Sequence, residues 1–338
     1  MKYSIVIPTY NRVDELQGTL ASLAGISCAD SWELIVADNN CTDGTRAAVA
    51  AASTTFPVRV KYVFEAVAGR CAALNAGISE AVGDIIVTID DDVRVQPDFL
   101  DQVGRAFATH ACDFIGGRVH PLWRGERPSW LPSHPTRHWA VIALLDHGPE
   151  PFEWDPLLPI GANMAFTRHA YELTGPWNND IGRKAGTLLG QEVREWCIRA
   201  RARGLRGFYT PDVFVHHVIH ADRLNKSYFR RWFYWRGVSR AIMYQQLGLD
   251  MQNPVARTYD FTRVPHIGGV PRYLLRSALA NLGRLARATL KRQETQAFEY
   301  ELVLWMFAGI ARQRWKDRRR PFAWAKDVMH AQSVVPSA

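Results

Sequence analysis

An alternation of short apolar runs with helical segments is the feature that most constrains how this chain can fold. Segments with apolar residues at helical spacing, such as Leu16, Leu20 and Leu23, follow runs with the composition of strands. Strands that alternate with helices in this way are typical of a mostly parallel sheet covered by helices on both faces. We therefore predict an α/β fold. The strand-like runs are 3–9 (YSIVIPT), 33–40 (ELIVADNN), 58–64 (VRVKYVF) and 84–89 (DIIVTI).

The regular alternation of strand-like and helical segments ends at about His120. Residues 120–159 are rich in Pro, Trp and His and predict a functional loop or lid. After it we expect strands at 161–168 and 207–218, a helix over 190–203, and helices beyond Asn225 with a break between Asp250 and Pro271. We predict one ordered domain over 1–224, made of two parts at 1–119 and 120–224. Residues 225–338 are predicted to form a helical C-terminal region.

Composition narrows the class of protein. The 338 residues carry a formal net charge of +8, which favours an anionic partner such as nucleic acid, a membrane surface or a phosphorylated ligand. The five cysteines are scattered and form no C-x-x-C pair, which fits a reducing cytosol. No apolar run approaches the roughly 18–20 residues of a transmembrane helix, and no signal-peptide pattern opens the chain. We expect a cytoplasmic protein.

The basic residues become denser toward the C-terminus. Between Arg272 and Arg320, arginine alternates with leucine and tryptophan at helical spacing. This pattern favours an interfacial helix over a solvated tail. We expect peripheral contact with the inner face of the plasma membrane, with ordinary packing or homo-oligomerisation as the alternatives.

Polar side chains gather where three of the predicted strands end. Thr9 to Arg12 follow the first strand, Asp38 to Asn40 the second, and Asp90 to Asp92 the fourth. In an open α/β sheet, ligands bind outside the carboxyl ends of the strands. Three adjacent carboxylates cost several kcal/mol of repulsion and desolvation unless a cation neutralises them. A hard divalent ion, Mg²⁺ or Mn²⁺, is the expected occupant, and it would bring a phosphorylated substrate; a solvated acidic turn is the alternative.

Two common nucleotide-binding motifs are absent. The chain has no G-x-G-x-x-G after its first strand and no G-x-x-x-x-G-K-[ST]. Neither a Rossmann dinucleotide site nor a P-loop is supported, so metal and arginine must hold the phosphates.

Eight motifs follow one another along the chain: SIVIPTYNR, LIVADNNCTDGT, GRCAALNAGI, TIDDDV, GANMAFTR, GQEVREWCIRARARG, YTPDVFVHHV and RLNKSYFRRWFYWRGVS. In this order they resemble the motifs of family 2 glycosyltransferases of the GT-A fold. The resemblance covers about residues 3–240 and implies a catalytic domain over 1–224, with a nucleotide-binding half at 1–119 and an acceptor-binding half at 120–224. It implies a GT-A sheet flanked by helices and inverting transfer from a nucleotide-diphospho-sugar, with a UDP-sugar favoured. The implied acceptor is a hydroxyl of a glycan or a lipid-linked sugar in cell-surface polysaccharide synthesis.

The same resemblance implies roles for individual residues. Asp92 and His217 would bind the metal, Mg²⁺ or Mn²⁺, while Asp90 would contact the donor ribose. His216 alternates to the other face of its strand and cannot share that role. The implied nucleotide-sugar contacts are Pro8, Thr9, Tyr10, Arg12, Asp38, Asn40, Arg70, Asn75, Asp90 and Asp91.

Inverting transfer also needs a general base for the acceptor hydroxyl. The family supplies it as the Asp of a Glu-Asp pair at the start of a helix, and this sequence departs from that pattern. Aligned from Gly190, the pair becomes Gln191 and Glu192; aligned back from Trp196 and Arg199, the Asp position becomes Val193. We predict Glu192 as the base, with Glu195 as the reserve.

Two other classes of function remain open. A sugar-phosphate nucleotidyltransferase would use a similar fold and metal, but PTYNRVDE lacks the glycine-rich loop G-x-G-x-R of that class. A non-enzymatic binder would use the net charge of +8 to hold nucleic acid or anionic lipid. The three clustered acids argue against nucleic acid, so we expect no nucleic-acid partner.

Overall fold

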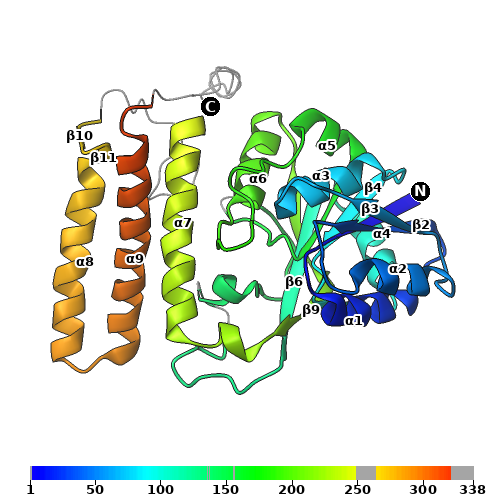
Figure 1. The fold of residues 1–338 in the computed structure, drawn as a ribbon, viewed down its shortest axis with the longest axis horizontal. Helices are drawn as coiled ribbons and strands as arrows, with labels where there is room; N and C mark the ends of the chain where they lie inside the picture. Colours follow the sequence, from blue (N-terminus) through cyan, green and yellow to red (C-terminus); the bar gives the residue numbers. More distant parts are fainter. Residues whose placement is uncertain (1, 135, 137, 155–156, 249–263, 321–338) are drawn as a thin grey trace. The chain divides into compact units, whose positions relative to one another are not determined.

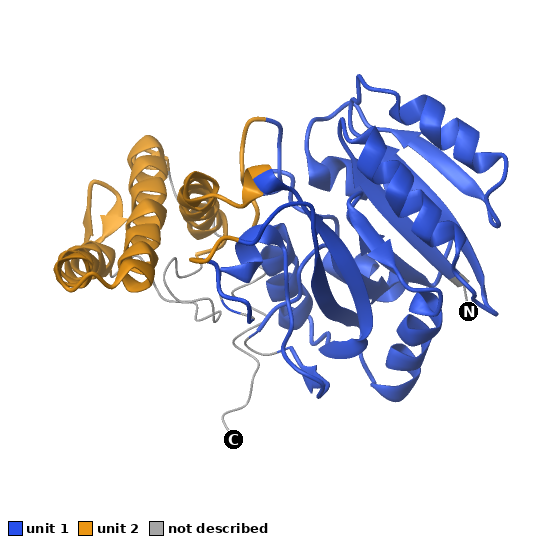
Figure 2. Ribbon diagram, turned by 90° about the horizontal axis from the view of Figure 1, so that it is seen from below, with its two compact units in different colours: residues 1–127, 131–185, 192–221 blue, residues 128–130, 186–191, 222–338 orange. Residues whose placement is uncertain are grey.

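The computed structural model describes residues 2–134, 136, 138–154, 157–248 and 264–320 (Figure 1). The chain divides into two compact units, coloured separately in Figure 2. The sheet unit comprises residues 1–127, 131–185 and 192–221, and the helical unit comprises residues 128–130, 186–191 and 222–338. The functional assignment of 1–224 and 225–338 to separate domains stays a prediction.

The N-terminal half of the sheet is parallel and contains the four predicted strands. Its order is β3-β2-β1-β4, so the first strand lies in the middle with the acid-ended strand beside it. The register pairs Thr9 with Asp38, which brings the polar ends of β1 and β2 to one edge. These strands are β1 (Lys2–Thr9), β2 (Ser31–Asp38), β3 (Val60–Phe64) and β4 (Ile85–Ile89).

The second half extends the sheet in a mixed arrangement. Beyond β4 the order continues β8-β6-β9-β5, and β7 also pairs with β9. β6 and β9 run parallel, while β8 is antiparallel to both β4 and β6. The predicted fold class, a mostly parallel sheet flanked by helices, is confirmed. These strands are β5 (Val93–Val95), β6 (Phe114–Trp123), β7 (Phe152–Glu153), β8 (Asn163–Thr167) and β9 (Gly207–Ile219).

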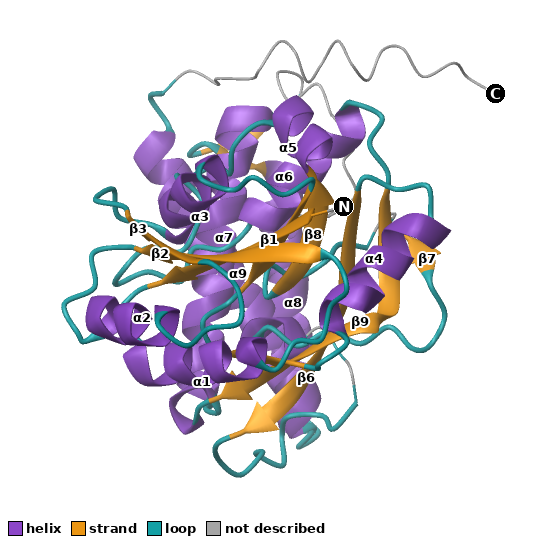
Figure 3. Ribbon diagram, turned by 90° about the vertical axis from the view of Figure 1, so that its right-hand side faces the viewer, coloured by secondary structure: helices purple, strands orange, loops and turns teal. Residues whose placement is uncertain are grey.

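Helices cover both faces of the sheet. α1 and α2 lie on one side of the parallel half and α3 on the other (Figures 1 and 3). α3 approaches the sheet closely at Gly77, where a Cβ would lie 2.6 Å from Val6 Cγ1. The helices of this unit are α1 (Val13–Ala24), α2 (Thr45–Ser53), α3 (Arg70–Ser79), α4 (Phe99–Thr109), α5 (Arg168–Thr174) and α6 (Glu192–Ala202).

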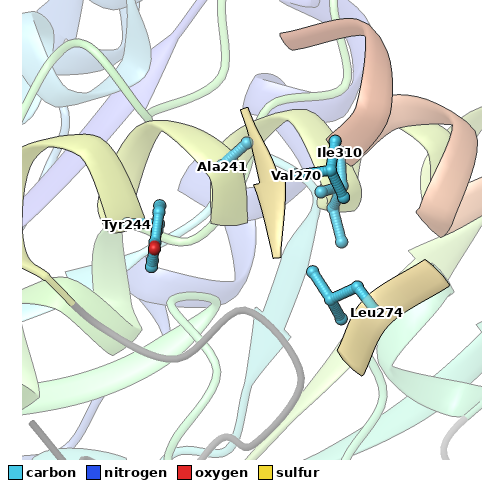
Figure 4. Close-up of a cluster of buried hydrophobic side chains, with 5 residues drawn as sticks. All are labelled: Ala241, Tyr244, Val270, Leu274 and Ile310. Atoms are coloured by element: carbon cyan, nitrogen blue, oxygen red, sulfur yellow. The ribbon is translucent and has the colours of Figure 1, made fainter. Parts of the chain in front are cut away.

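The helical unit packs three long helices around a small apolar core. α9 (Glu294–Asp317) packs against both α7 (Lys226–Leu247) and α8 (Arg272–Leu290). A hairpin of β10 (His266–Ile267) and β11 (Val270–Pro271) adjoins them. The side chain of Asn225 caps α7 by accepting a hydrogen bond from the backbone N–H of Tyr228, at 2.9 Å. The core contains Ala241, Tyr244, Val270, Leu274 and Ile310 (Figure 4).

Several predicted boundaries were wrong by a few residues. The third strand starts at Val60 rather than residue 58, and the helix expected over 190–203 is α6, Glu192–Ala202. The expected loop over 120–159 contains the end of β6, a 3₁₀ turn at Trp139–Ile142 and β7. It is partly structured because Trp139 and Trp154 are buried; the ring centroid of Trp154 lies 5.4 Å from that of Tyr209. The helix break expected between Asp250 and Pro271 falls largely outside the described residues, which leave out 249–263.

None of the described helices combines the length and apolar composition needed to cross a bilayer.

The crossing of α7 and α9 generates a stability prediction. A Cβ at Gly309 would lie 2.0 Å from the backbone oxygen of Tyr234, so Gly309→Ala should lower the free energy of unfolding of the helical unit by about 1–3 kcal/mol. The control Gly283→Ala, in α8, meets nothing within 4 Å and should raise it by about 0.5–1 kcal/mol. Native-state hydrogen exchange of α7 and α9 amides measures both effects. Unchanged protection in Gly309→Ala would contradict so close a crossing.

Candidate active site

Strand pairing brings the predicted metal ligands together. β4 ends at Ile89, the three aspartates form a turn, and β5 begins at Val93. β5 pairs antiparallel with β9 so that Val93 lies opposite His217. His217 Nε2 is therefore 3.1 Å from Asp92 Oδ1, although the two residues are far apart in sequence. His216 points to the other face, where its Nδ1 lies 3.4 Å from Gln96 Nε2.

Asp90, Asp92 and His217 have the chemistry of a divalent-cation site. One ligand atom from each lies within 4.8 Å of the other two, and this is the only such group of three or more acidic, His or Cys side chains among the described residues. Ligands about 2.1 Å from a Mg²⁺-sized ion lie about 3–4 Å from one another, so small side-chain movements would close the cluster on an ion. Two carboxylates and an imidazole also suit Mn²⁺. The residues fit the implied cofactor.

Arginine 12 supplies the positive charge that this acidic turn needs. Its Nη1 donates to Asp91 Oδ1 at 2.9 Å and to Asp92 Oδ2 at 2.7 Å. Thr9 Oγ1 donates to the other oxygen of Asp91, at 2.8 Å. Burial raises the pKa of Asp91 to about 6, against the opposing effect of Arg12. Burial also disfavours the Arg12 cation, but Asp92 and Asp91 more than offset this, so the pKa of Arg12 is raised overall.

The backbone of the turn is held from two further sides. Thr19 Oγ1, in α1, lies 2.7 Å from the backbone oxygen of Asp91 and 2.9 Å from that of Val93. The backbone N–H of Val218 donates to the backbone oxygen of Asp92 at 2.8 Å. Thr19 was missed from the sequence, although a polar residue on the same helical face as Leu16 and Leu20 was a signal. These bonds fix the direction in which the three carboxylates point.

Arginine 70 connects the acidic turn to the predicted base. It donates to Asp90 Oδ1 from Nη2 at 2.6 Å and from Nε at 3.1 Å, and to the backbone oxygen of Gly161 at 3.0 Å. Its Nη1 lies 3.5 Å from Glu192 Oε1, at the first residue of α6. Burial lowers the pKa of Arg70, while Asp90 and Glu192 raise it by more. Arg70, Asp90 and Glu192 therefore form one ion-paired group.

The end of β2 is organised by its own side chains. Asp38 accepts from the Tyr62 hydroxyl at 2.8 Å and from the backbone N–H of Cys41 at 2.7 Å. Asn40, whose φ of 64° is left-handed, donates to the backbone oxygen of Glu65 at 3.0 Å. Asn39, which the sequence did not single out as a binding residue, accepts from the backbone N–H of Gly69 at 2.7 Å. Asn39 thereby fixes the residue before Arg70.

The remaining predicted residues lie in different environments. Pro8 is buried within β1, whereas Tyr10 is 45% exposed. Asn75 is engaged away from the acids: its side chain bonds both the backbone N–H and the backbone oxygen of Trp177, each at 2.9 Å. Glu195 is 3% exposed and pairs with Arg199 at 2.7 Å. The structure thus brings Thr9, Arg12, Arg70, Asp90, Asp91, Asp92, Glu192 and His217 into one connected group.

The sequence is similar to those of known glycosyltransferases. The model of glycosyl transferase family 2 matches residues 4–171. A glucosyl-dolichyl phosphate glucuronosyltransferase of Haloferax volcanii is 23% identical over 258 residues, covering 72% of this chain and 77% of that protein. A dolichol-phosphate mannosyltransferase of Pyrococcus furiosus is 29% identical over 119 residues, covering 35% of this chain and only 33% of that protein.

A solved structure shares the fold. It is a mannosyltransferase from Pyrobaculum calidifontis in complex with GDP-Man and Mn²⁺, and it aligns with a TM-score of 0.58 at 18% identity. The alignment covers 93% of this chain and 87% of that one. At this identity the likeness establishes the architecture alone.

The charges around Asp92 generate a metal-binding prediction. Arg12 Nη1 donates to Asp92 Oδ2 and so competes with a cation for the charge of this carboxylate. Arg12→Gln should therefore tighten Mn²⁺ binding about tenfold, or about 1.4 kcal/mol. Asp92→Asn removes a ligand and should weaken binding at least about tenfold. Isothermal titration with MnCl₂ measures both constants.

Asp212→Asn is the matched control for these variants. Asp212 is an exposed carboxylate on the strand that carries His217, and its removal should leave the affinity unchanged. Loss of Mn²⁺ binding in Arg12→Gln would show that Arg12 supports the site rather than competing for it.

Proposed function

The chain belongs to glycosyl transferase family 2, and on that premise we propose that it moves a sugar from a nucleotide-diphospho-sugar to a hydroxyl acceptor with inversion. It is a glycosyltransferase; the donor, the stereochemistry and the acceptor are the proposed parts. The observation that supports this proposal is one ion-paired group, in which Arg70 joins Glu192 to the cluster of Asp90, Asp92 and His217. Family membership favours this reaction over a nucleotidyltransferase or a non-enzymatic binder.

The donor would lie along the carboxyl edge of the parallel strands. Asp38 and Tyr10, at the ends of β2 and β1, would contact the base, and Asp90 the ribose. When bound, a divalent cation would neutralise the developing charge on the departing nucleotide diphosphate. Arg12, which pairs with Asp91 and Asp92, would be available to the diphosphate once a cation balanced those carboxylates. A UDP-sugar is the donor that we propose, and Mg²⁺ or Mn²⁺ the ion.

Glu192 would be the base of the reaction. It is 8% exposed, and its position at the start of α6 places its carboxylate beside Arg70. A single displacement requires only that one carboxylate accept the acceptor's proton as the new glycosidic bond forms. The ion pair with Arg70 orients Glu192 relative to Asp90, and thus relative to the sugar. Glu195, one turn further along α6, is ion-paired with Arg199.

The acceptor is proposed from the names of the relatives. One is named as a glucosyl-dolichyl phosphate glucuronosyltransferase and another as a dolichol-phosphate mannosyltransferase. A glycan or lipid-linked sugar in cell-surface polysaccharide synthesis is therefore the acceptor class that we propose. The cytoplasmic location and the homo-oligomer expected from the sequence stay predictions.

A nucleotide screen tests the proposed donor and cofactor. We expect UDP, and UDP-sugars, to raise the thermal midpoint only with Mn²⁺ or Mg²⁺ present, and EDTA to remove the effect. A ligand at 100 times its Kd stabilises a protein by about 2.7 kcal/mol, which such a scan resolves. Stabilisation by GDP or dTDP in place of UDP would correct the base, and no response to any nucleoside diphosphate with metal would contradict the function.

The base assignment generates a separate prediction. Glu192→Gln keeps the shape of the side chain but cannot accept the proton, so kcat for sugar transfer should fall by about 10²–10⁴-fold. The affinity for nucleotide and Mn²⁺ should change no more than a few-fold. Single-turnover transfer kinetics and nucleotide titrations measure the two quantities.

Glu195→Gln is the control for this variant. Loss of its ion pair with Arg199 should lower thermal stability while the rate per folded enzyme is retained. A normal rate in Glu192→Gln together with a lost rate in Glu195→Gln would transfer the role to Glu195.

A further inference from the structure

Helix α8 has one buried seam and a broad outer face. Leu274, Asn281 and Ala288 are its buried residues, and they recur every seventh position. In the helical unit, α8 packs on α9, which lies between α8 and α7 (Figure 1). The outer surface of α8 is therefore covered by no other described helix of its unit.

Leucines occupy part of this outer face. Leu279, Leu282 and Leu290 are 70%, 54% and 86% exposed. At about 100° per residue they fall within an arc of about 80°, roughly opposite the seam that contains Asn281. Large apolar side chains grouped on one arc, rather than scattered singly, indicate an interaction surface.

Basic side chains lie beside the leucines. Arg276, Arg287 and Arg284 fall on the adjoining arc at about 100° per residue. Arg272 lies within the leucine arc, and two further basic residues follow the end of the helix. The segment 272–292 contains no Asp or Glu. Its six basic residues are exposed, and none of them pairs with a carboxylate of any residue that the structure describes. The outer face thus carries a positive charge that no carboxylate within the described ranges neutralises by pairing. These residues are Arg272, Arg276, Arg284, Arg287, Lys291 and Arg292.

We propose that the outer face of α8 docks on the surface of an anionic lipid bilayer. Leucines beside arginines match such a surface, because the apolar arc can enter the boundary between headgroups and acyl chains while the guanidinium groups bind lipid phosphates. Basic residues near an anionic leaflet add to the attraction. This surface lies in the helical unit and does not depend on the proposed donor, base or acceptor.

Other occupants match the face less well. A second copy packed through a twofold axis would bring the same basic arc against itself, where like charges repel. Nucleic acid would use the arginines but would leave the exposed leucines without a role. The bilayer is the occupant that uses both arcs.

Vesicle co-sedimentation of the full chain tests the docking. We expect binding to vesicles of phosphatidylcholine with about 30% phosphatidylglycerol, little binding to phosphatidylcholine alone, and a decline as salt rises from about 50 to about 500 mM. Leu279→Gln with Leu290→Gln, and separately Arg276→Glu with Arg287→Glu, should each lower the partition coefficient at least about tenfold. All four positions are exposed, so folding should be retained.

Matched variants in the sheet unit serve as controls. Leu157→Gln with Leu173→Gln changes leucines that are 45% and 43% exposed, and Arg59→Glu with Arg105→Glu makes the same change in charge. Both controls should bind vesicles as the unaltered chain does. Nucleotide-dependent thermal shifts, measured on every variant, report the donor site separately, so failure of docking and failure of the proposed transfer are distinguishable.

Four results would overturn the docking. The unaltered chain could stay in the supernatant with anionic vesicles, or both α8 variants could sediment as it does. The leucine variant could bind normally while DNA competes for the arginines, which would indicate a nucleic-acid surface. Light scattering could show that the α8 variants convert a dimer to a monomer without altering vesicle binding, which would assign the face to a second copy.

Discussion

Three adjacent carboxylates at the end of a buried strand stay together because two guanidinium groups from other parts of the sheet unit balance them. Arg12, after β1, pairs with Asp91 and Asp92, and Arg70, opening α3, pairs with Asp90. Buried ions of one sign are costly unless such partners lie in contact. The parallel pairing of β1 with β4 brings the first arginine to the turn. The same charges make the turn a place where a divalent cation can replace a protein cation.

The other residues of the site are arranged around these ion pairs. The antiparallel pairing of β5 with β9 carries His217 to Asp92. Arg70 uses its remaining donors on the backbone of Gly161 and on Glu192, so the group that is proposed to bind the donor also orients the proposed base. Charge neutralisation, the proposed metal ligation and the placement of the proposed base are consequently coupled. An altered Arg70 would disturb all three.

Local sequence patterns predicted much of the fold and of the site, and the other contacts depend on pairing between strands and loops that are distant in the sequence. The four parallel strands and the acidic turn could be found because alternating apolar runs and strand-end acids are local signals. The contact between His217 and Asp92 was implied only by the family resemblance, because it depends on β5, whose three residues are too few to give a periodic signal. Thr19 and Asn39 act through hydrogen bonds to distant backbone, which no spacing reveals. The loop expected over 120–159 was too broad a prediction because buried aromatic packing orders part of it.

The most direct measurement of the central claim is anomalous diffraction from crystals grown with MnCl₂ and a nucleoside diphosphate. The charge balance predicts a manganese peak about 2.0–2.3 Å from a carboxylate oxygen of Asp92, with Arg12 turned away from that carboxylate toward the diphosphate. A map with nucleotide bound, no manganese beside Asp92, and Arg12 still paired with Asp91 and Asp92 would contradict it.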